Sequence, residues 1–461
     1  MATSSSEAIS LKEAISTALT SNPTIGESME SREAIEFELR QAKGLYLPSV
    51  DLEASSGARS LDNPSRRSSG LDNDPLYPSE VSLVLTQKLY DGGRTRAEID
   101  RQASRVDSAS FRVLERSESV GLQIVREYLE YMLQAEIVAQ SNENLRVHQS
   151  IASSISKSIQ NGTLTEADRQ QVSERIYAAR AKVEQAKEAL AAADIQFRKL
   201  VGTSIARPQM PKSVAYALPK SLNEAIDLGL RSNPRISVAN ADVDAADSLV
   251  DAAKADFLPE VVFEGRARTG HDLDGADGRT TDFQARVVAR WNLYRGGIKL
   301  ANEREQIRRS GEQRMIRSQA HRDVEEAVRT SWDRRIRQNN LAQIYRSQAN
   351  ENNRLVGSYR KQFDIGQRSL LDVLDAQNTR FNVDVLSKTA VYASRFAEYR
   401  LLAATGQLLN TLDLAAPAQS EAYARDEFKS RRNETRKEYK RAPSRQVNDF
   451  PLDILSPIRR D

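Results

Sequence analysis

Ser10-Leu-Lys-Glu-Ala-Ile-Ser-Thr-Ala-Leu-Thr-Ser-Asn-Pro23 occurs twice in this chain, the second time as Ser221-Leu-Asn-Glu-Ala-Ile-Asp-Leu-Gly-Leu-Arg-Ser-Asn-Pro234. The offset of 221 − 10 = 211 residues persists to Leu47-Pro48, which returns as Leu258-Pro259. An internal repeat of this length fixes the architecture before any other feature does. We therefore expect two copies of one large unit.

The register between the two copies changes once. Leu89-Tyr-Asp-Gly-Gly93 matches Leu293-Tyr-Arg-Gly-Gly297, and here the offset is 293 − 89 = 204, so the second copy is 211 − 204 = 7 residues shorter in between. The interval is rich in Asp, Asn, Gly, Pro and Ser, as expected of an exposed loop that tolerates deletion. The expected segments are a flexible N-terminus (1–9), a first unit (10–209), a second unit (210–412) and a charged, disordered tail (413–461).

Composition narrows the class of protein. Aromatic residues make up 6% and charged residues 28% of the 461 residues, which favours long solvated helices over a thick core. Lys+Arg 67 against Asp+Glu 64 leaves a net charge of +3, so no global field indicates a nucleic-acid partner. The chain has no cysteine, which excludes disulfides, thiolate metal sites and cysteine nucleophiles.

No catalytic motif stands out in the sequence. Neither a glycine-rich phosphate loop nor a nucleophile elbow occurs. The three histidines, His148, His271 and His321, are isolated, and we expect each of them on a solvated surface. The sequence therefore predicts a protein without enzyme activity, metal or cofactor.

The chain has no run approaching the roughly 18 apolar residues of a transmembrane helix. Its first residues, Met-Ala-Thr-Ser-Ser-Ser, also lack the apolar core of a secretory signal. Two readings follow: a cytosolic protein, or a mature chain from which a signal was removed.

Each copy predicts two helices followed by two strands. The first helix ends at Ser-Asn-Pro, because the residue before proline is pushed out of helical geometry. The clearest strand, Phe283 to Leu293, alternates apolar and polar residues with the period of two that gives a strand one apolar face. The strands are expected at about 46–60, 79–91, 257–271 and 282–294.

Very long helices follow the Gly-Gly segments. Gly93 to Gln160 and Gly297 to Asp364 lack proline and carry apolar residues spaced by four, so each predicts a helix about 100 Å long. Turns at Gly162 and Gly366 then return the chain in a second helix. Neither hairpin can bury its apolar stripe alone, so we expect both to be walls of a larger assembly.

Four strands with one apolar face cannot close a barrel. Open edges are a liability in water and leave backbone groups without partners in lipid. We therefore expect several chains to pool their strands in an outer-membrane-type barrel. The aromatic residues near the strand ends, suited to the membrane interface, are Tyr46, Tyr90, Trp291 and Tyr294.

Three features together resemble the TolC family of outer-membrane channels. They are the doubled Ser-Leu-x-Glu-Ala-Ile opening with Asn-Pro, the two Leu-Tyr-x-Gly-Gly segments, and the turn Phe363-Asp-Ile-Gly-Gln-Arg-Ser-Leu-Leu-Asp-Val-Leu-Asp-Ala376. The resemblance covers about Ser10 to Leu412. It implies mixed helical and membrane-β structure: a homotrimer whose twelve-stranded barrel, four strands per chain, lies in outer-membrane lipid and continues into a helical barrel across the periplasm.

The resemblance also implies a function and partners. The function is the passive exit duct of a tripartite export system, carrying drugs or toxic compounds, secreted proteins, or both. The partners are a periplasmic adaptor and an inner-membrane transporter, either ABC-type or proton-driven, and no nucleic acid. Location in the outer membrane would favour the reading in which a signal was removed.

The same resemblance implies residues of a gate at the periplasmic entrance. Asp372 and Asp375 match the aspartates that ring the family's entrance, and such a ring favours cations. Arg368 matches the arginine that bonds the neighbouring hairpin, with Asp168 as its natural acceptor. Phe363 replaces the family's gate tyrosine and Ala167 its threonine partner, so we expect the Arg368–Asp168 pair and Phe363 packing to hold the gate. The tips expected to dock the adaptor are Gly162, Thr163, Leu164, Gly366 and Gln367.

Two alternatives remain open at this point. A soluble coiled-coil scaffold explains the long helices but not the paired strands. A periplasmic adaptor also has long hairpins, yet it would carry a compact β-rich domain that the sequence does not show. The substrate cannot be read from the sequence, since a polar tunnel selects weakly.

Overall fold

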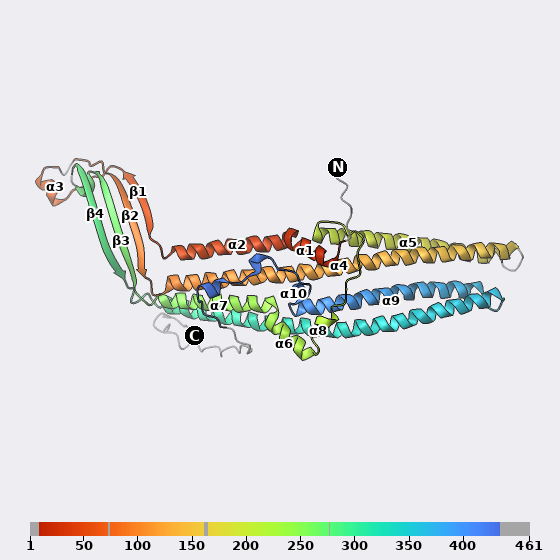
Figure 1. The fold of residues 1–461 in the computed structure, drawn as a ribbon. Helices are drawn as coiled ribbons and strands as arrows, with labels where there is room; N and C mark the ends of the chain where they lie inside the picture. Colours follow the sequence, from red (N-terminus) through yellow and green to blue (C-terminus); the bar gives the residue numbers. More distant parts are fainter. Residues whose placement is uncertain (1–8, 72–73, 161–164, 276, 434–461) are drawn as a thin grey trace, which may run out of the picture. The chain divides into compact units, whose positions relative to one another are not determined.

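The computed structural model describes residues 9–71, 74–160, 165–275 and 277–433 (Figure 1). The strands are β1 (Ser49–Ser56), β2 (Ser79–Tyr90), β3 (Glu260–His271) and β4 (Arg279–Arg290). The helices are α1 (Leu11–Ser21), α2 (Pro23–Gly44), α3 (Pro64–Ser68), α4 (Arg94–Gln160), α5 (Glu166–Val201), α6 (Leu222–Ser232), α7 (Pro234–Ala255), α8 (Ile298–Asp364), α9 (Leu370–Ala404), α10 (Leu408–Thr411) and α11 (Ala424–Glu427). None of the helices in this part of the chain combines the length and apolar character needed to cross a bilayer.

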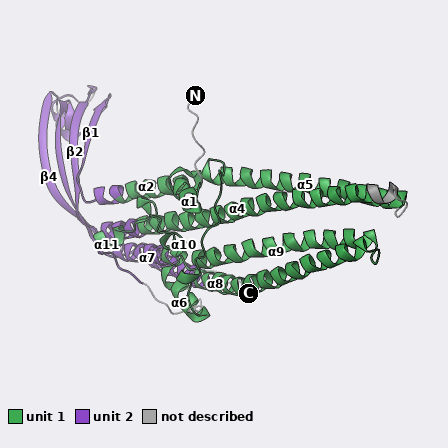
Figure 2. Ribbon diagram, turned by 45° about the vertical axis from the view of Figure 1, so that its right-hand side comes forward, with its two compact units in different colours: residues 1–39, 105–238, 320–427 green, residues 40–104, 239–319, 428–461 purple. Residues whose placement is uncertain are grey.

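The chain forms two compact units that cut across the two sequence copies (Figure 2). Within the described residues, unit 1 comprises 9–39, 105–238 and 320–427. Unit 2 comprises 40–104, 239–319 and 428–433. Each copy of the repeat therefore contributes helices to both units, whereas all four strands belong to unit 2.

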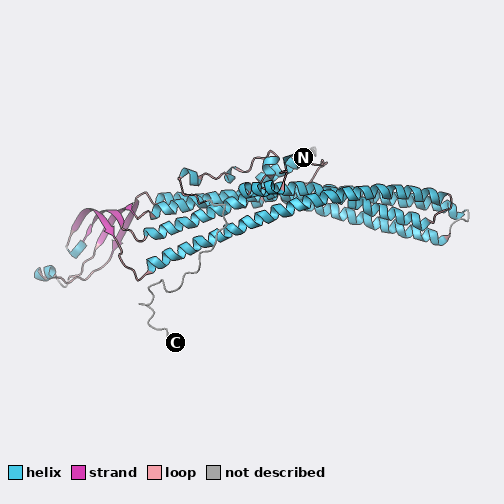
Figure 3. Ribbon diagram, turned by 90° about the horizontal axis from the view of Figure 1, so that it is seen from below, coloured by secondary structure: helices cyan, strands magenta, loops and turns pink. Residues whose placement is uncertain are grey.

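The four strands form one antiparallel sheet in the order β1-β2-β3-β4 (Figure 1). Figure 3 shows this sheet in magenta against the cyan helices. β4 pairs with β3 along its whole length, from Arg279 opposite His271 to Arg290 opposite Glu260. We expected this strand at 282–294. It lies three to four residues earlier, because the partner strand β3 begins only at Glu260 and leaves residues 291–294 without a ladder.

The sheet has two faces of opposite character. Cross-strand partners place Leu52, Leu83, Ala267 and Phe283 in one row, and the large apolar side chains of this face are exposed. The other face carries charges. Their bonds include Arg268 to Asp282 at 3.2 Å, and both Arg286 and Arg290 to Glu264 at 2.8 Å. This alternation is the one expected from the sequence, now extended over all four strands.

The Asn-Pro segments join helices within unit 1. Asn22 donates from Nδ2 to the carbonyl of Leu200, at 2.8 Å, while its Oδ1 accepts from the N–H of Thr24. Asn233 repeats both bonds, to the Ala404 carbonyl at 2.9 Å and from the N–H of Arg235. Each asparagine thus caps the new helix and ties it to the end of a returning one.

The core of unit 1 is thin and runs along the helices. Tyr128 of α4 is fully buried beside Phe197 of α5. Its hydroxyl accepts from the N–H of Gln209 at 2.9 Å and lies within hydrogen-bond distance of the carbonyls of Ile9 and Gln209. The face of α1 that carries Ala14 and Ile15 is buried as well. Most other helical side chains are only partly covered, in keeping with the low aromatic content.

The C-terminal segment departs from the expected disorder between residues 413 and 433. Asp107 of α4, fully buried, accepts from the backbone N–H of Ala424 at 2.8 Å and from Arg425 Nε at 2.8 Å. Tyr423 lies against the guanidinium of Arg32. A buried ion pair therefore lies within a segment whose composition alone indicated disorder. The remainder of the tail, 434–461, lies outside the described residues.

Candidate functional site

The turn between α8 and α9 is shaped by one glycine. Gly366 has φ +77°, a left-handed conformation that favours glycine, and closes the last turn of α8 through its N–H bond to the Phe363 carbonyl. The chain then enters α9 through Ser369, whose hydroxyl accepts from the N–H of Asp372 at 3.2 Å and donates to its carboxylate. This pair is a capping box.

The start of α5 has the same construction. Thr165 and Asp168 form a capping box, in which the N–H and hydroxyl of Thr165 both donate to the carboxylate. These bonds hold the pKa of Asp168 below its ordinary value. Asp168 and Asp372, which are 372 − 168 = 204 residues apart, therefore share one local role: each stabilises the first turn of a returning helix.

An apolar cluster joins the hairpin ends inside unit 1. The buried side chains of Ile151 and Ile155 from α4, Val172 from α5, and Leu370 and Leu374 from α9 form this tip cluster. Phe363 of α8 packs against it and is partly buried. Phe363 thus makes an apolar contact at the position where we expected packing in place of a polar latch.

Arg368 does not pair with Asp168 within the chain. Its guanidinium lies 4.1 Å from the ring centre of Tyr359, and its Nε donates to Gln362 at 3.2 Å. Its nearest carboxylate is that of Asp372, at 3.8 Å. Because Asp168 already accepts from Thr165, both expected partners are engaged on their own hairpins, and a bond between copies of the chain stays a prediction.

A different ion pair connects the two hairpins. Arg175 of α5 donates from Nη2 to Asp375 of α9 at 3.0 Å. We did not anticipate this pair, although Arg175 follows Asp168 by seven residues and so lies on the same helical stripe. Asp375 therefore brings a paired carboxylate to the tips rather than a free one.

His148 contradicts the expectation of a solvated histidine. Its side chain is 2% exposed, on α4 just before the tip cluster. Burial, and then the charge of Arg175, hold the pKa of His148 below its ordinary value, against a smaller opposing effect of Glu174.

The other predicted residues fall into two groups. Gly162, Thr163 and Leu164 lie outside the described residues, whereas Gly366 is exposed and Gln367 beside it is too. Tyr46, Tyr90, Trp291 and Tyr294 are all exposed in unit 2, and all four lie at the same end of the sheet, next to the start of β1 and the ends of β2 and β4.

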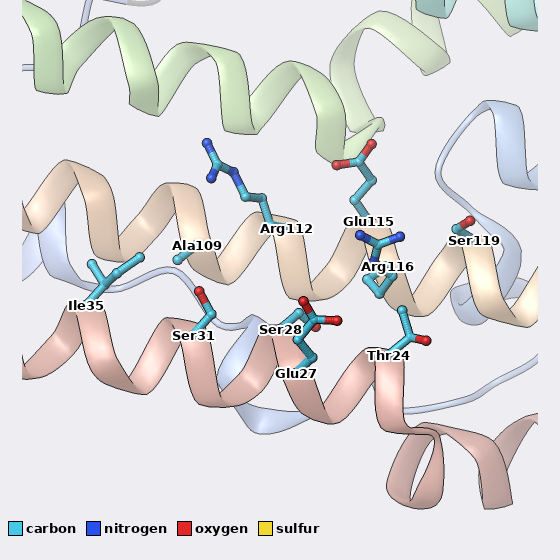
Figure 4. Close-up of a pocket in the computed structure, with 10 residues that line it drawn as sticks. All are labelled: Thr24, Glu27, Ser28, Ser31, Ile35, Ala109, Arg112, Glu115, Arg116 and Ser119. Carbon is cyan, nitrogen blue, oxygen red and sulfur yellow. The ribbon is translucent and has the colours of Figure 1, made fainter.

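A groove of about 340 Å³ lies between α2 and α4 in unit 1 (Figure 4). Its charged side chains are Arg112, Arg116, Glu27 and Glu115, and the rest are mainly small or hydroxylic. Arg112 and Glu115 point away from α2. The charges neither converge on one point nor combine with a nucleophile, so the groove offers no catalytic arrangement. Among the described residues, no group of histidines, cysteines and carboxylates could hold a metal ion.

Known proteins are similar to this chain in sequence and in fold. A family model described as "Outer membrane efflux protein" matches residues 14–203 and again 225–407. The chain is 26% identical to the outer membrane efflux protein BepC of Brucella suis over 345 residues, 71% of this chain and 72% of BepC. It is 24% identical to protein CyaE of Bordetella pertussis over 257 residues, 55% of this chain and 53% of CyaE.

Among solved structures, the CmeC outer membrane channel of Campylobacter jejuni is similar with a TM-score of 0.75 at 17% identity. That match covers 91% of this chain and 89% of CmeC. At this identity the likeness concerns the fold alone. It indicates that a four-stranded sheet with long helical hairpins is the fold of an outer-membrane channel chain.

Proposed function

The chain belongs to the outer membrane efflux protein family, and from that premise we propose that it is the passive exit duct of a tripartite export system in the outer membrane. The observation that carries the proposal is the sheet. It exposes large apolar side chains on one face, places charges on the other, and leaves β1 and β4 as open edges. A soluble scaffold would expose this apolar face to water, so that alternative is disfavoured.

Closure of the barrel requires further copies of the chain. Three copies contribute four strands each, and β4 of one copy runs antiparallel to β1 of the next, so every strand finds a partner. The aromatic residues Tyr46, Tyr90, Trp291 and Tyr294 would then form one band at the membrane interface.

Charge on the two open edges supports this closure. On the polar face β1 carries Asp51 and Glu53, whose partners on β2 are the uncharged Val84 and Ser82. On the same face β4 carries Arg286 and Arg290, which share the single carboxylate of Glu264. An acidic edge therefore meets a basic edge, and the attraction favours registers that bring these four residues together.

Cysteine cross-linking tests the closure, because the natural chain has no cysteine. Within one chain β1 and β4 are three strand spacings apart, about 14 Å, which is too far for a disulfide. Chains with Glu53→Cys and either Arg286→Cys or Arg290→Cys should form covalent dimers and trimers on oxidation. Chains with Glu53→Cys and Asp282→Cys should not form covalent dimers or trimers. A register that places Glu53 opposite Asp282 would bring two carboxylates together in the natural protein. Absence of covalent trimers from both arginine pairs would contradict this closure.

We further propose that the hairpin tips form the entrance that opens. Arg368 of one copy and Asp168 of a neighbouring copy, the Arg175–Asp375 pair and the tip cluster would hold the closed state, and three copies of Asp372 and Asp375 would favour cations there. The tips around 162–164 and 366–367 would dock a periplasmic adaptor that connects an inner-membrane transporter. The duct itself would use no cofactor and perform no chemistry.

One pair of measurements tests the function as a whole. The protein should be recovered from the outer-membrane fraction only with detergent, as a trimer, and it should conduct ions in planar lipid bilayers. Recovery as a detergent-free soluble monomer or dimer would contradict the duct and favour the scaffold. The adaptor would be identified separately, by cross-linking it in the native envelope to the cysteine introduced by Gly366→Cys.

A further inference from the structure

Five buried polar side-chain atoms on α4 have no hydrogen-bond partner in the described part of the chain. One of them, Glu136 Oε2, lies in an ion pair with Lys388, so four are left without any partner. They are Gln140 Oε1, Ser141 Oγ, Asn144 Oδ1 and His148 Nδ1. Ser141, Asn144 and His148 are each more than nine-tenths buried. Buried polar atoms are almost always hydrogen-bonded, so four of them within one short stretch of helix form a cluster that demands a physical cause. We call these four side chains the polar seam.

The polar seam lies between two contacts of α4 with α9 inside unit 1: Glu136 bonds α9 before it, and Ile151 shares the tip cluster with Leu374 of α9 after it. Gln140, Asn144 and His148 are spaced by four residues, so they lie along one stripe of the helix. The stripe is preceded by Glu136, whose Oε1 accepts from the Tyr392 hydroxyl of α9 at 2.8 Å. Its other carboxylate oxygen lies 2.8 Å from Lys388 Nζ, also of α9.

The opposite end of the polar seam lies at the Arg175–Asp375 pair. His148 is close enough to Arg175 of α5 for its pKa to be lowered by that charge, and Arg175 in turn bonds Asp375 of α9 at 3.0 Å. Paired charges therefore bound the seam at both ends, while its middle consists of neutral polar groups. A buried polar group left without a partner lowers stability, so four such groups on one short stretch of helix would weaken a thin core.

We propose that the polar seam holds enclosed water molecules, and that this hydrated contact is where α4 and α9 shift when the entrance opens. Enclosed water commonly satisfies buried polar groups that lack protein partners. Hydroxyl, amide and imidazole groups on one stripe offer each water several bonds. The second half of the proposal rests on the proposed function, because it assumes that the tips open.

The contrast with the neighbouring tip cluster explains why the shift would occur here. Ile151, Ile155 and Leu374 make a dry contact, and separating it exposes apolar surface to water. The polar seam exposes no such surface, because waters can exchange partners as the helices move. The tip cluster therefore acts as the closure and the polar seam as the hinge beside it.

Radiolytic hydroxyl-radical labelling of the full-length protein in detergent tests for the water. Radicals form from water in place, so a buried side chain next to enclosed water is modified, whereas a buried side chain in a dry core is not. His148 should be labelled, after correction for intrinsic reactivity, well above Phe197, which is fully buried in the dry core. Equal corrected labelling of His148 and Phe197 would overturn the proposal.

Two matched variants separate the seam from general effects of mutation. Asn144→Leu replaces a seam side chain with an apolar one of similar size, and labelling of His148 should be lost. Asn142→Leu makes the same change two residues away, where the amide bonds the Val138 carbonyl instead, and labelling should persist. Labelling that survives Asn144→Leu unchanged would overturn the assignment of the water to these four atoms.

The role in opening is measured independently of the labelling. In lipid bilayers the Asn144→Leu channel should open less often than the Asn142→Leu channel. Equal opening of the two, with His148 labelled, would overturn the hinge while leaving the water in place. Absence of conductance from every variant and from the unmodified protein would instead contradict the proposed duct. The labelling would still test the enclosed water, because that test does not depend on the duct.

Discussion

Two aspartates at the hairpin tips stabilise the first turns of their own helices, independently of any role in a gate. Asp168 and Asp372 cap their own helices, and the sequence could have shown this, because Thr165-x-x-Asp168 and Ser369-x-x-Asp372 follow the capping-box pattern. The Arg175–Asp375 pair could not be read from one sequence. Its members are 200 residues apart, and only the packing of α5 on α9 brings them together.

Removing the Arg175–Asp375 pair should loosen the tips. Arg175→Ala leaves Asp375 without its partner, so we expect a larger cation conductance in bilayers, with a change in unfolding free energy of only about 1 kcal/mol or less because the pair is partly exposed. Arg354→Ala is the control, since it breaks an exposed pair with Glu351 inside one helix. Equal conductance of the two variants would show that the pair between hairpins does not restrain the entrance.

Glu118 should make the stability of unit 1 depend on pH. Its carboxylate is buried and accepts from the N–H groups of Leu408 and Leu409, and burial raises its pKa from 4.5 to about 7. A raised carboxyl pKa means that folding favours the protonated form, so the stability it contributes is complete below pH 4.5 and is lost as pH rises through about 7. The loss is at most about 3 kcal/mol.

The comparison with Glu118→Gln isolates this effect. The amide keeps an acceptor for the two N–H groups but does not titrate, so the variant should lack the decrease in unfolding temperature between pH 5 and pH 8 that the unmodified protein shows. The same decrease in both proteins would assign the pH dependence to other groups.

At the scale of elements, the boundaries of the helices were predictable and those of the strands were less so. Gly93 and Gly297 precede α4 and α8, and the prolines Pro23 and Pro234 begin α2 and α7, because these residues impose or forbid specific backbone conformations. Strand ends instead depend on the partner. The ladder with β3 stops β4 at Arg290, although the alternating pattern continues to Leu293.

The two Asn-Pro junctions give a matched prediction. Asn22→Ala and Asn233→Ala each remove a helix cap and a bond to the end of α5 or α9, so each should lower the free energy of unfolding by about 1–2 kcal/mol. Asn410→Ala, which removes only an exposed bond to Gln407, should have little effect. Thermal unfolding in detergent measures all three. A loss for one junction but not the other would show that the repeated sequence does not have a repeated role.

At the scale of the whole chain, sequence periodicity cannot reveal contacts between residues that are far apart in the sequence. The family and its channel fold could be anticipated from the repeated motifs, because these set the order of helices and strands. The path of residues 413–433 could not be anticipated, because their composition resembles that of a disordered tail. The contact between Asp107 and Arg425, which are 425 − 107 = 318 residues apart, is visible only in the structure. Contacts between residues far apart in the chain therefore place this segment, which has no long apolar face.

Arg425→Ala tests whether that contact anchors the segment. The change leaves Asp107 as a buried charge with only backbone donors, and removing one partner of a buried ion pair costs about 3–5 kcal/mol. Unit 1 should therefore unfold at a clearly lower temperature, and proteolysis should cut before residue 424 in the folded protein. Arg431→Ala is the control, because its pair with Asp251 at 3.6 Å is exposed and worth at most about 1 kcal/mol. Equal unfolding temperatures and equal resistance to cleavage in the two variants would contradict this anchor. The segment would then be held by its other contacts, such as that of Tyr423 with Arg32, and the buried pair would only neutralise Asp107.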